Sequence, residues 1–387
     1  MQGYKYRFSE GHLNDKEAGT TWKLKRKLFI NCEEEMNKER SYYLDYLRII
    51  SILLLFPVHT FMIWNDYGQK FYVWSGENKL LSSLIILINP WFMPLLFAIA
   101  GMCARYSLEK RTEKEFILER VIKLFVPFLS GIILLVPFQT LFARKYFYNY
   151  SGTLQENILY FFSHFTDLSG YDGCFTPGQL WFLLFLFIIS LVSLLLFKMV
   201  PYDKIARWAV KMNIYIIVGL FICVWMAYYI GNFGGFSLGK NMVLYLLGYY
   251  ILSNETILDE LEKYRNILFG LFCFCLIMLF VFYYYFSYYG DIAVNFIGWL
   301  GICSLIPFAK KHFNKRTKLL VYFKKASFPL YILHQSILVA VGYYVLLYVD
   351  GILIQAVSIL AVSFLLTLGI YELIKRIPYV RVLFGIK

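Results

Sequence analysis

The chain has 387 residues, of which 59% are hydrophobic and only 16% are charged. A soluble domain of this size has no interior large enough for so much apolar material, so the composition excludes an ordinary soluble protein. The apolar runs are continuous and do not alternate, which favours an all-α bundle of transmembrane helices over a transmembrane β-barrel.

The net charge is +13, a value that in a soluble domain would suggest binding to nucleic acid. In a helical membrane protein, basic loops on the cytoplasmic side explain the same charge. We therefore expect the lipid bilayer, and no nucleic acid, as a partner of the chain.

Residues 1–40 are polar, mixed in charge and lack the apolar core of a signal peptide. They predict a cytoplasmic N-terminal tail that is disordered or at most a loose helix. Met36 is a candidate for the biological start, because a short basic lead into an apolar run follows it. The integral membrane domain is predicted over 41–376, and a cytoplasmic C-terminal tail over 377–387.

Ten apolar segments are predicted to cross the bilayer, each close to the ~20 residues that a span needs. They cover 44–64, 80–104, 121–142, 178–199, 212–231, 237–252, 266–287, 291–309, 327–348 and 352–374. The segment 237–252 is short, so nine spans is the alternative.

The loop charges support ten spans. If the spans alternate, the loops on one side carry only five of the 38 Lys and Arg residues: Lys70, Lys79, Arg144, Lys145 and Lys240. The positive-inside rule then places the other side, with both termini, in the cytoplasm. Both termini on one side require an even number of spans.

The first span carries two ionisable residues, Arg48 and His59, eleven positions apart. Eleven steps of 100° return to within about 20° of the starting direction, so both lie on one helix face, roughly 16 Å apart along the axis. Pro57 is expected to kink the helix beside His59. His59 is a candidate general base, or else a structural His bonded to a neighbouring helix. Asp45, one turn before Arg48, is placed to orient or neutralise it.

A second basic pair opens the third span. Arg120 and Lys123 are spaced i, i+3 and would hold phosphate oxygens. Plain positive-inside topology is the competing explanation. Upstream, Pro90 and Pro94 are expected to break the second span, and Gly101 allows a close helix approach.

Three further features lie toward the outer side or late in the chain. The exterior segment 143–177 contains an apolar stretch from 154 to 165 that predicts an interfacial helix, either a cover for an acceptor or a simple connector. Trp181 marks the outer entry of the fourth span, where interface anchoring also explains it. His334 lies inside the ninth span and either faces His59 or makes a helix–helix hydrogen bond.

The seven cysteines predict no disulfide framework, because most lie within predicted spans and no exterior pair is present. No clustered His or carboxylate residues accompany them, so no metal site is predicted.

The chain resembles the acyltransferase-3 family of integral membrane acyltransferases. The resemblance extends over about 41–375, with four motifs in the family's order. They are Leu44–Arg48 with His59; Met93–Phe97 with Gly101, followed by Arg120, Lys123 and Pro127; Leu180–Leu183; and Ser327, Tyr331 and His334. The chain departs from the family where Lys123 replaces a second Arg, Gln179 replaces a frequent His and Ala100 replaces a Ser.

The resemblance implies an enzyme that transfers an acyl group, acetyl or succinyl, from cytoplasmic acyl-CoA to a hydroxyl of a cell-envelope glycan or related polyol. Acetyl-CoA or succinyl-CoA would be the co-substrate, and no metal is needed. Arg48, Arg120 and Lys123 would hold or guide the CoA, with His59 as general base. The implied location is the inner (plasma) membrane of a bacterium. A transporter or flippase of a lipid-linked sugar is the alternative, although the two halves of the chain show no convincing repeat.

Overall fold

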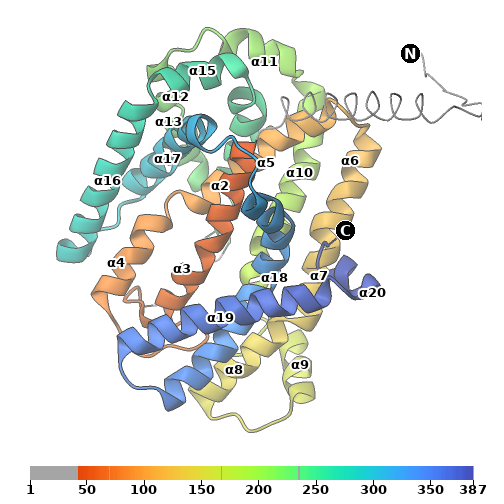
Figure 1. Cartoon of the computed structure of the whole chain (residues 1–387), viewed down its shortest axis with the longest axis vertical. Helices are drawn as coiled ribbons and strands as arrows, with labels where there is room; N and C mark the ends of the chain where they lie inside the picture. The colour runs from red at the N-terminus through yellow and green to blue at the C-terminus, as the bar shows by residue number, and fades with distance from the viewer. Residues whose placement is uncertain (1–41, 69, 167, 234–235, 387) are drawn as a thin grey trace, which may run out of the picture. The chain divides into compact units, whose positions relative to one another are not determined.

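The computed structural model describes residues 42–68, 70–166, 168–233 and 236–386. The predicted N-terminal tail, with the candidate start Met36, lies outside the described residues. Strands in the described part are limited to a short antiparallel pair, β1 (Asn232–Phe233) and β2 (Phe236–Ser237). The rest of the regular structure is helical, which confirms the all-α fold class (Figure 1).

The helical elements follow one another in two halves of the chain. The first half contains α2 (Tyr42–Leu53), α3 (Leu55–Phe61), the 3-10 turn η1 (Met62–Trp64), α4 (Lys79–Ile88), α5 (Phe92–Leu108), α6 (Glu113–Arg120), the π-helical turn η2 (Val121–Phe125), α7 (Val126–Leu134), α8 (Val136–Tyr148), α9 (Leu154–Ser163), the 3-10 turn η3 (Gly178–Leu180) and α10 (Trp181–Met199). The second half contains α11 (Tyr202–Ala209), α12 (Ile214–Gly219), α13 (Phe221–Tyr228), α14 (Leu238–Leu247), the π-helical turn η4 (Gly248–Leu252), α15 (Glu255–Lys263), α16 (Arg265–Phe286), α17 (Asp291–His312), α18 (Lys318–Tyr348), α19 (Ile352–Ile374) and α20 (Pro378–Leu383).

Eight helical segments of the described chain are long and apolar enough to cross a membrane, and each matches a predicted span. The predicted spans 212–231 and 237–252 correspond to the shorter segments α12–α13 and α14–η4. A helix of about fifteen residues rises only roughly 22 Å, less than the ~30 Å hydrocarbon core. The total of ten spans and the cytoplasmic position of both termini therefore stay predictions.

Prolines set the breaks in the long helical segments. α2 ends at Leu53 and α3 begins at Leu55, so the break falls one turn before Pro57, which has no N–H to bond the carbonyl four residues earlier. The second span breaks between α4 and α5 at Pro90. In the third span, Pro127 has no N–H to bond the carbonyl of Lys123. The helix widens there into the π-helical turn η2, in which the Val126 N–H bonds the Val121 carbonyl.

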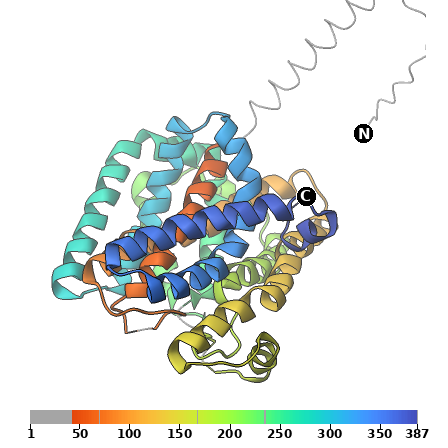
Figure 2. The same cartoon turned by 60° about the horizontal axis from the view of Figure 1, so that its bottom comes forward.

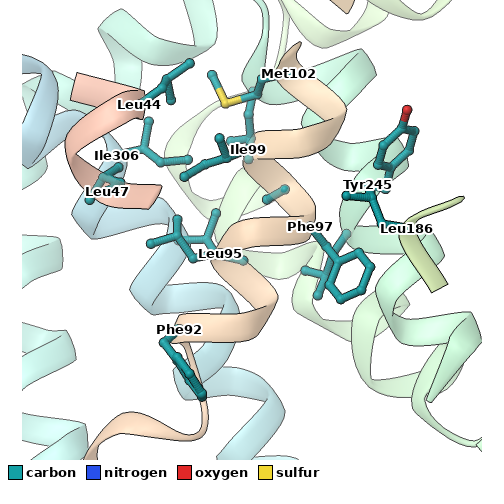
Figure 3. Packing of buried hydrophobic residues seen from close by; sticks show 14 of the residues in the cluster. Leu44, Leu47, Phe92, Leu95, Phe97, Ile99, Met102, Leu186, Tyr245 and Ile306 are labelled. Atoms are coloured by element: carbon teal, nitrogen blue, oxygen red, sulfur yellow. The ribbon is translucent and has the colours of Figure 1, made fainter. Parts of the chain in front are cut away.

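α5 is the central helix of the core. Its side chains are buried in several directions, toward Leu44 of α2 and Ile306 of α17 on one side and Tyr245 of α14 on the other (Figure 3). Gly101 makes the contact with α14 possible, since a Cβ there would lie 1.9 Å from the Tyr245 carbonyl oxygen. The predicted close approach at Gly101 is thus present.

α18 is the helix that positions the candidate site. It packs against α3, α8 and α19 (Figures 1 and 2). Beyond α19, the predicted C-terminal tail contains the short helix α20, and the Ser130 hydroxyl of α7 donates to the Leu383 carbonyl at its end. The contacts of α18 with α3 and α8 place it between the first span and the third.

Candidate functional site

The two intramembrane histidines form one pair. His59 of α3 and His334 of α18 are 275 residues apart in sequence, yet the Nδ1 of His59 lies 3.1 Å from the Nε2 of His334. The Nδ1 of His334 lies 2.6 Å from the Tyr331 carbonyl oxygen. His334 is fully buried, whereas His59 keeps part of its surface accessible.

The hydrogen-bond chain determines which nitrogen of each neutral ring carries the proton. The Tyr331 carbonyl only accepts, so the Nδ1 of His334 must donate to it, and the Nε2 of His334 then has a lone pair. The Nδ1 of His59 therefore donates to that lone pair. This leaves the Nε2 of His59 unprotonated, which is the state a general base requires.

Aromatic rings from the loops cover His59 through Phe71. Phe71, in the loop after α3, stacks on His59 with ring centroids 6.0 Å apart and planes at 16°. Phe71 in turn contacts Tyr72 and Tyr171, and the Tyr72 hydroxyl donates to the Ser169 carbonyl. We call Phe71, Tyr72 and Tyr171 the aromatic cover. It belongs to the loops predicted to be exterior, including the long segment 143–177.

A set of hydrogen-bonded polar side chains lies next to Tyr331, the residue whose carbonyl accepts from His334. The Tyr331 hydroxyl donates to the Gln179 carbonyl, and the Gln179 Nε2 donates to the Ile332 carbonyl at 3.0 Å. Ser336 and Gln139 of α8 continue this set. The sequence analysis did not single out Gln139 or Ser336, although an amide within the apolar run of α8 was a usable signal.

Arg48 lies at the other end of the first span and does not belong to the histidine pair. It faces Asp45 at 3.6 Å, and its Nη2 lies 2.5 Å from the Cys103 sulfur of α5. Asp45 also accepts a 2.6 Å hydrogen bond from Lys324 of α18. About a third of the Arg48 side chain (36%) is exposed. The predicted neutralisation by Asp45 is therefore shared with a lysine from a distant helix.

The structure places Arg120 and Lys123 with different partners. Lys123 and Arg111 both pair with the carboxylate of Glu119. The Arg120 guanidinium lies over the Phe116 ring at 4.4 Å, and its Nε has no hydrogen-bond partner in the described part of the chain. The π-helical turn that starts at Val121 follows Arg120 directly and contains Lys123, so it changes the regular α-helical i, i+3 spacing there.

The remaining predicted features lie near the outer loops. Trp181 is half-buried, and its ring stacks on Phe236 at 4.1 Å and also contacts Phe97 and Phe185, so it packs among aromatic side chains of the bundle. The expected helix over 154–165 is present as α9. Within the described residues, no group of three His, Cys, Asp or Glu residues is arranged to hold a metal ion, and the six described cysteines are free thiols.

Comparison with known proteins gives one family. Residues 41–372 match the family model described as an acyltransferase domain, which represents the acyltransferase-3 family. No curated protein and no solved structure matches the chain. The family match covers well over half of the chain and includes every helix that contributes to the histidine pair. The chain therefore belongs to the acyltransferase-3 family and is a membrane acyltransferase.

Proposed function

We propose that the protein transfers an acyl group, acetyl or succinyl, from cytoplasmic acyl-CoA to a hydroxyl of a cell-envelope glycan or related polyol. The observation that carries the proposal is the hydrogen-bond chain from Tyr331 through His334 to His59, which leaves the His59 Nε2 as an available base. His59 is partly accessible whereas His334 is fully buried, which favours His59 as the residue that meets the acceptor. The proposed location is the inner (plasma) membrane of a bacterium.

The reaction moves one proton through His59. The acceptor oxygen attacks the thioester carbonyl carbon while the His59 Nε2 takes the hydroxyl proton. The tetrahedral intermediate then collapses, the carbon–sulfur bond breaks, and the CoA thiolate receives that proton and leaves as the thiol. While His59 is an imidazolium, its Nδ1–H bond to His334 is charge-assisted and stabilises it.

The donor side of the proposal uses the cations at the other end of the first span. Arg48 lies roughly 16 Å along the helix from His59, a distance that an extended thioester arm spans. Arg48 and Arg120 suit the CoA phosphates, since Arg48 is partly exposed and the buried Arg120 Nε lacks a partner among the described residues. Lys123 would have to share its charge with Glu119.

The proposal is tested with membranes that contain the full chain, radiolabelled acetyl-CoA or succinyl-CoA, and added cell-envelope glycans. His59→Ala should reduce label transfer by about 10²–10⁴-fold, the usual contribution of a general base. His312→Ala is the matched control, because His312 lies at the end of α17 against Phe308, outside the histidine pair.

Two results would contradict the proposal. Full transfer by His59→Ala would remove His59 as the base. Failure of the folded wild type to transfer label from either donor would favour the transporter or flippase reading.

A further inference from the structure

Two buried glutamines beside the histidine pair each have one unpaired amide atom. Gln139 of α8 is fully buried and Gln179 of η3 is 5% exposed. Both contact the Ser336 hydroxyl, Gln139 through Oε1 at 3.4 Å and Gln179 through Nε2 at 3.5 Å. The Gln139 Nε2 and the Gln179 Oε1 have no hydrogen-bond partner in the part of the chain that the structure describes. We call Gln139, Gln179 and Ser336 the amide cluster.

The unpaired atoms do not depend on how the amide of Gln139 is turned. Its two ends differ only in the exchange of oxygen for nitrogen, so one end contacts Ser336 and the other is left without a partner in either orientation. Buried polar atoms without partners are rare in folded proteins, and each calls for an explanation. A hydroxyl group both donates and accepts, so it satisfies a free amide end in either orientation.

The amide cluster is linked to the histidine pair through Tyr331, whose hydroxyl donates to the Gln179 carbonyl and whose own carbonyl accepts from His334. Ser336 follows His334 by two residues on α18, and Gln179 bonds the Ile332 carbonyl of the same turn. On the loop side, a Cβ at Gly178 would lie 2.5 Å from the Gln139 Nε2 and 3.6 Å from the Tyr72 hydroxyl. The free end of Gln139 therefore packs directly against Gly178, close to the Tyr72 hydroxyl, where any larger residue would collide with the amide.

The aromatic cover links the two places. Tyr72 lies at Gly178, and its neighbour Phe71 stacks on His59. The cover thus connects the free end of Gln139 with the imidazole of His59 through two adjacent rings. Aromatic rings next to amide donors and acceptors suit a ligand with both apolar faces and hydroxyls, as a sugar ring has.

We propose that the amide cluster is an acceptor subsite that binds a second, non-reacting hydroxyl of the acceptor while His59 activates the first. This inference rests on the proposed function, because it takes His59 as the base. It narrows the acceptor class to polyols with at least two neighbouring hydroxyls and disfavours simple alcohols. Gln139 and Gln179 are then binding residues whose hydrogen bonds orient the acceptor.

The test uses Gln139→Met and Gln179→Met in the full-length protein in lipid vesicles. Met is unbranched and close to Gln in length, so it fills the same space without the amide. Gln355→Met is the matched control, since Gln355 of α19 is also buried but its amide already bonds the Val349 carbonyl at 2.7 Å.

Three quantities are measured: the KM for the envelope-glycan fraction that the wild type labels, the KM for acyl-CoA, and the midpoint of thermal unfolding. Gln139→Met should raise the acceptor KM about tenfold, the effect of one lost hydrogen bond, and leave the donor KM unchanged. The midpoint should fall less than in Gln355→Met, because the change removes an amide end without a partner and one long 3.4 Å contact with Ser336, whereas Gln355→Met removes a 2.7 Å hydrogen bond. The Gln355→Met control should keep both KM values of the wild type.

An unchanged acceptor KM in both variants would overturn the inference and leave a buried water as the partner of the amides. A fall in the unfolding midpoint with no selective change in acceptor KM would assign the glutamines a structural role and also overturn it. If the wild type transfers no label, the proposed function fails. The subsite is then tested by glycan binding, measured as the shift that the glycan fraction causes in the unfolding midpoint. A glycan fraction that raises the midpoint of the wild type but not of Gln139→Met would then support the subsite, and equal shifts would refute it.

Discussion

Replacement of His334 by leucine tests the proposed division of roles, with His59 as the base and His334 as the residue that positions it. In the structure, His334 contacts His59 through its Nε2 and is fully buried, so an acceptor reaches His59 and not His334. His334→Leu removes the lone pair that accepts the His59 Nδ1–H. The His59 ring then loses one of the contacts that fix its orientation and tautomer, while its stack on Phe71 stays.

The magnitude follows from the charge that His59 gains during the reaction. In the transition state the lost bond would join an imidazolium to a neutral nitrogen, and hydrogen bonds to charged groups contribute about 1.5–3 kcal/mol. At about 1.4 kcal/mol for each factor of ten, kcat should fall by about 10–150-fold. The KM for acyl-CoA should stay unchanged, because Arg48 and Arg120 lie outside the histidine pair.

The assay measures kcat and KM for the full-length protein in vesicles, with one substrate varied while the other is kept in excess. It compares the wild type with His59→Ala, His334→Leu and the double variant. If His334 acts only through His59, the double variant should be as slow as His59→Ala alone. A His334→Leu enzyme with wild-type kcat would refute the reasoning. So would a double variant whose loss equals the product of the two single losses, since that result requires independent roles.

Three other predictions concern the frame of the site and its donor end. Gly101→Ala should lower the stability of the solubilised protein by about 1–3 kcal/mol, as seen in the thermal unfolding midpoint, because the added Cβ meets the Tyr245 carbonyl oxygen. Arg48→Ala should raise the KM for acyl-CoA about 10-fold or more with the acceptor KM unchanged, through the loss of a charge-assisted phosphate contact. Burial raises the pKa of Asp66, in the loop after α3, but hydrogen bonds with Tyr283, Lys79 and Ser82 outweigh it and hold the pKa below the ordinary 3.8. This carboxylate should therefore stabilise the fold above pH 3.8 and lose that contribution as the pH falls further, an acid loss that Asp66→Asn should abolish in unfolding measurements.

The fold was accessible from sequence because apolar runs and proline positions are local signals. Pro57, Pro90 and Pro127 each mark a break or a change of the helical ladder. Pro94, which was also expected to break the second span, lies instead in the first turn of α5, where a helix tolerates a missing N–H. The sequence does not show what structure the backbone adopts at each break. At Pro127 the chain widens into a π-helical turn, and this local change alters the i, i+3 spacing of Arg120 and Lys123 in a way that a regular 3.6-residue period does not predict.

The site was accessible only in part. The sequence identified His59 and His334 as rare ionisable groups inside apolar spans, and such groups are functional candidates one by one. Their 3.1 Å contact depends on how α18 packs against α3, which no local pattern encodes. Gln139 and Ser336 were missed for the same reason. Each is an ordinary polar residue on its own helix, and only tertiary packing shows that the two meet and leave one amide end unpaired.

The depth of the histidine pair bears on how two very different substrates meet. His59 precedes Trp64, the end of the first helical segment, by five residues, or roughly 8 Å of helix, whereas Arg48 lies roughly 16 Å away in the other direction. With the orientation predicted from loop charge, the base is therefore nearer to the outer surface. A glycan carries many hydroxyls, and taking them into hydrocarbon is costly unless each finds a partner. A thioester arm is slender and flexible, so the proposed function requires the arm to cross most of the bundle while the glycan enters only as far as the aromatic cover.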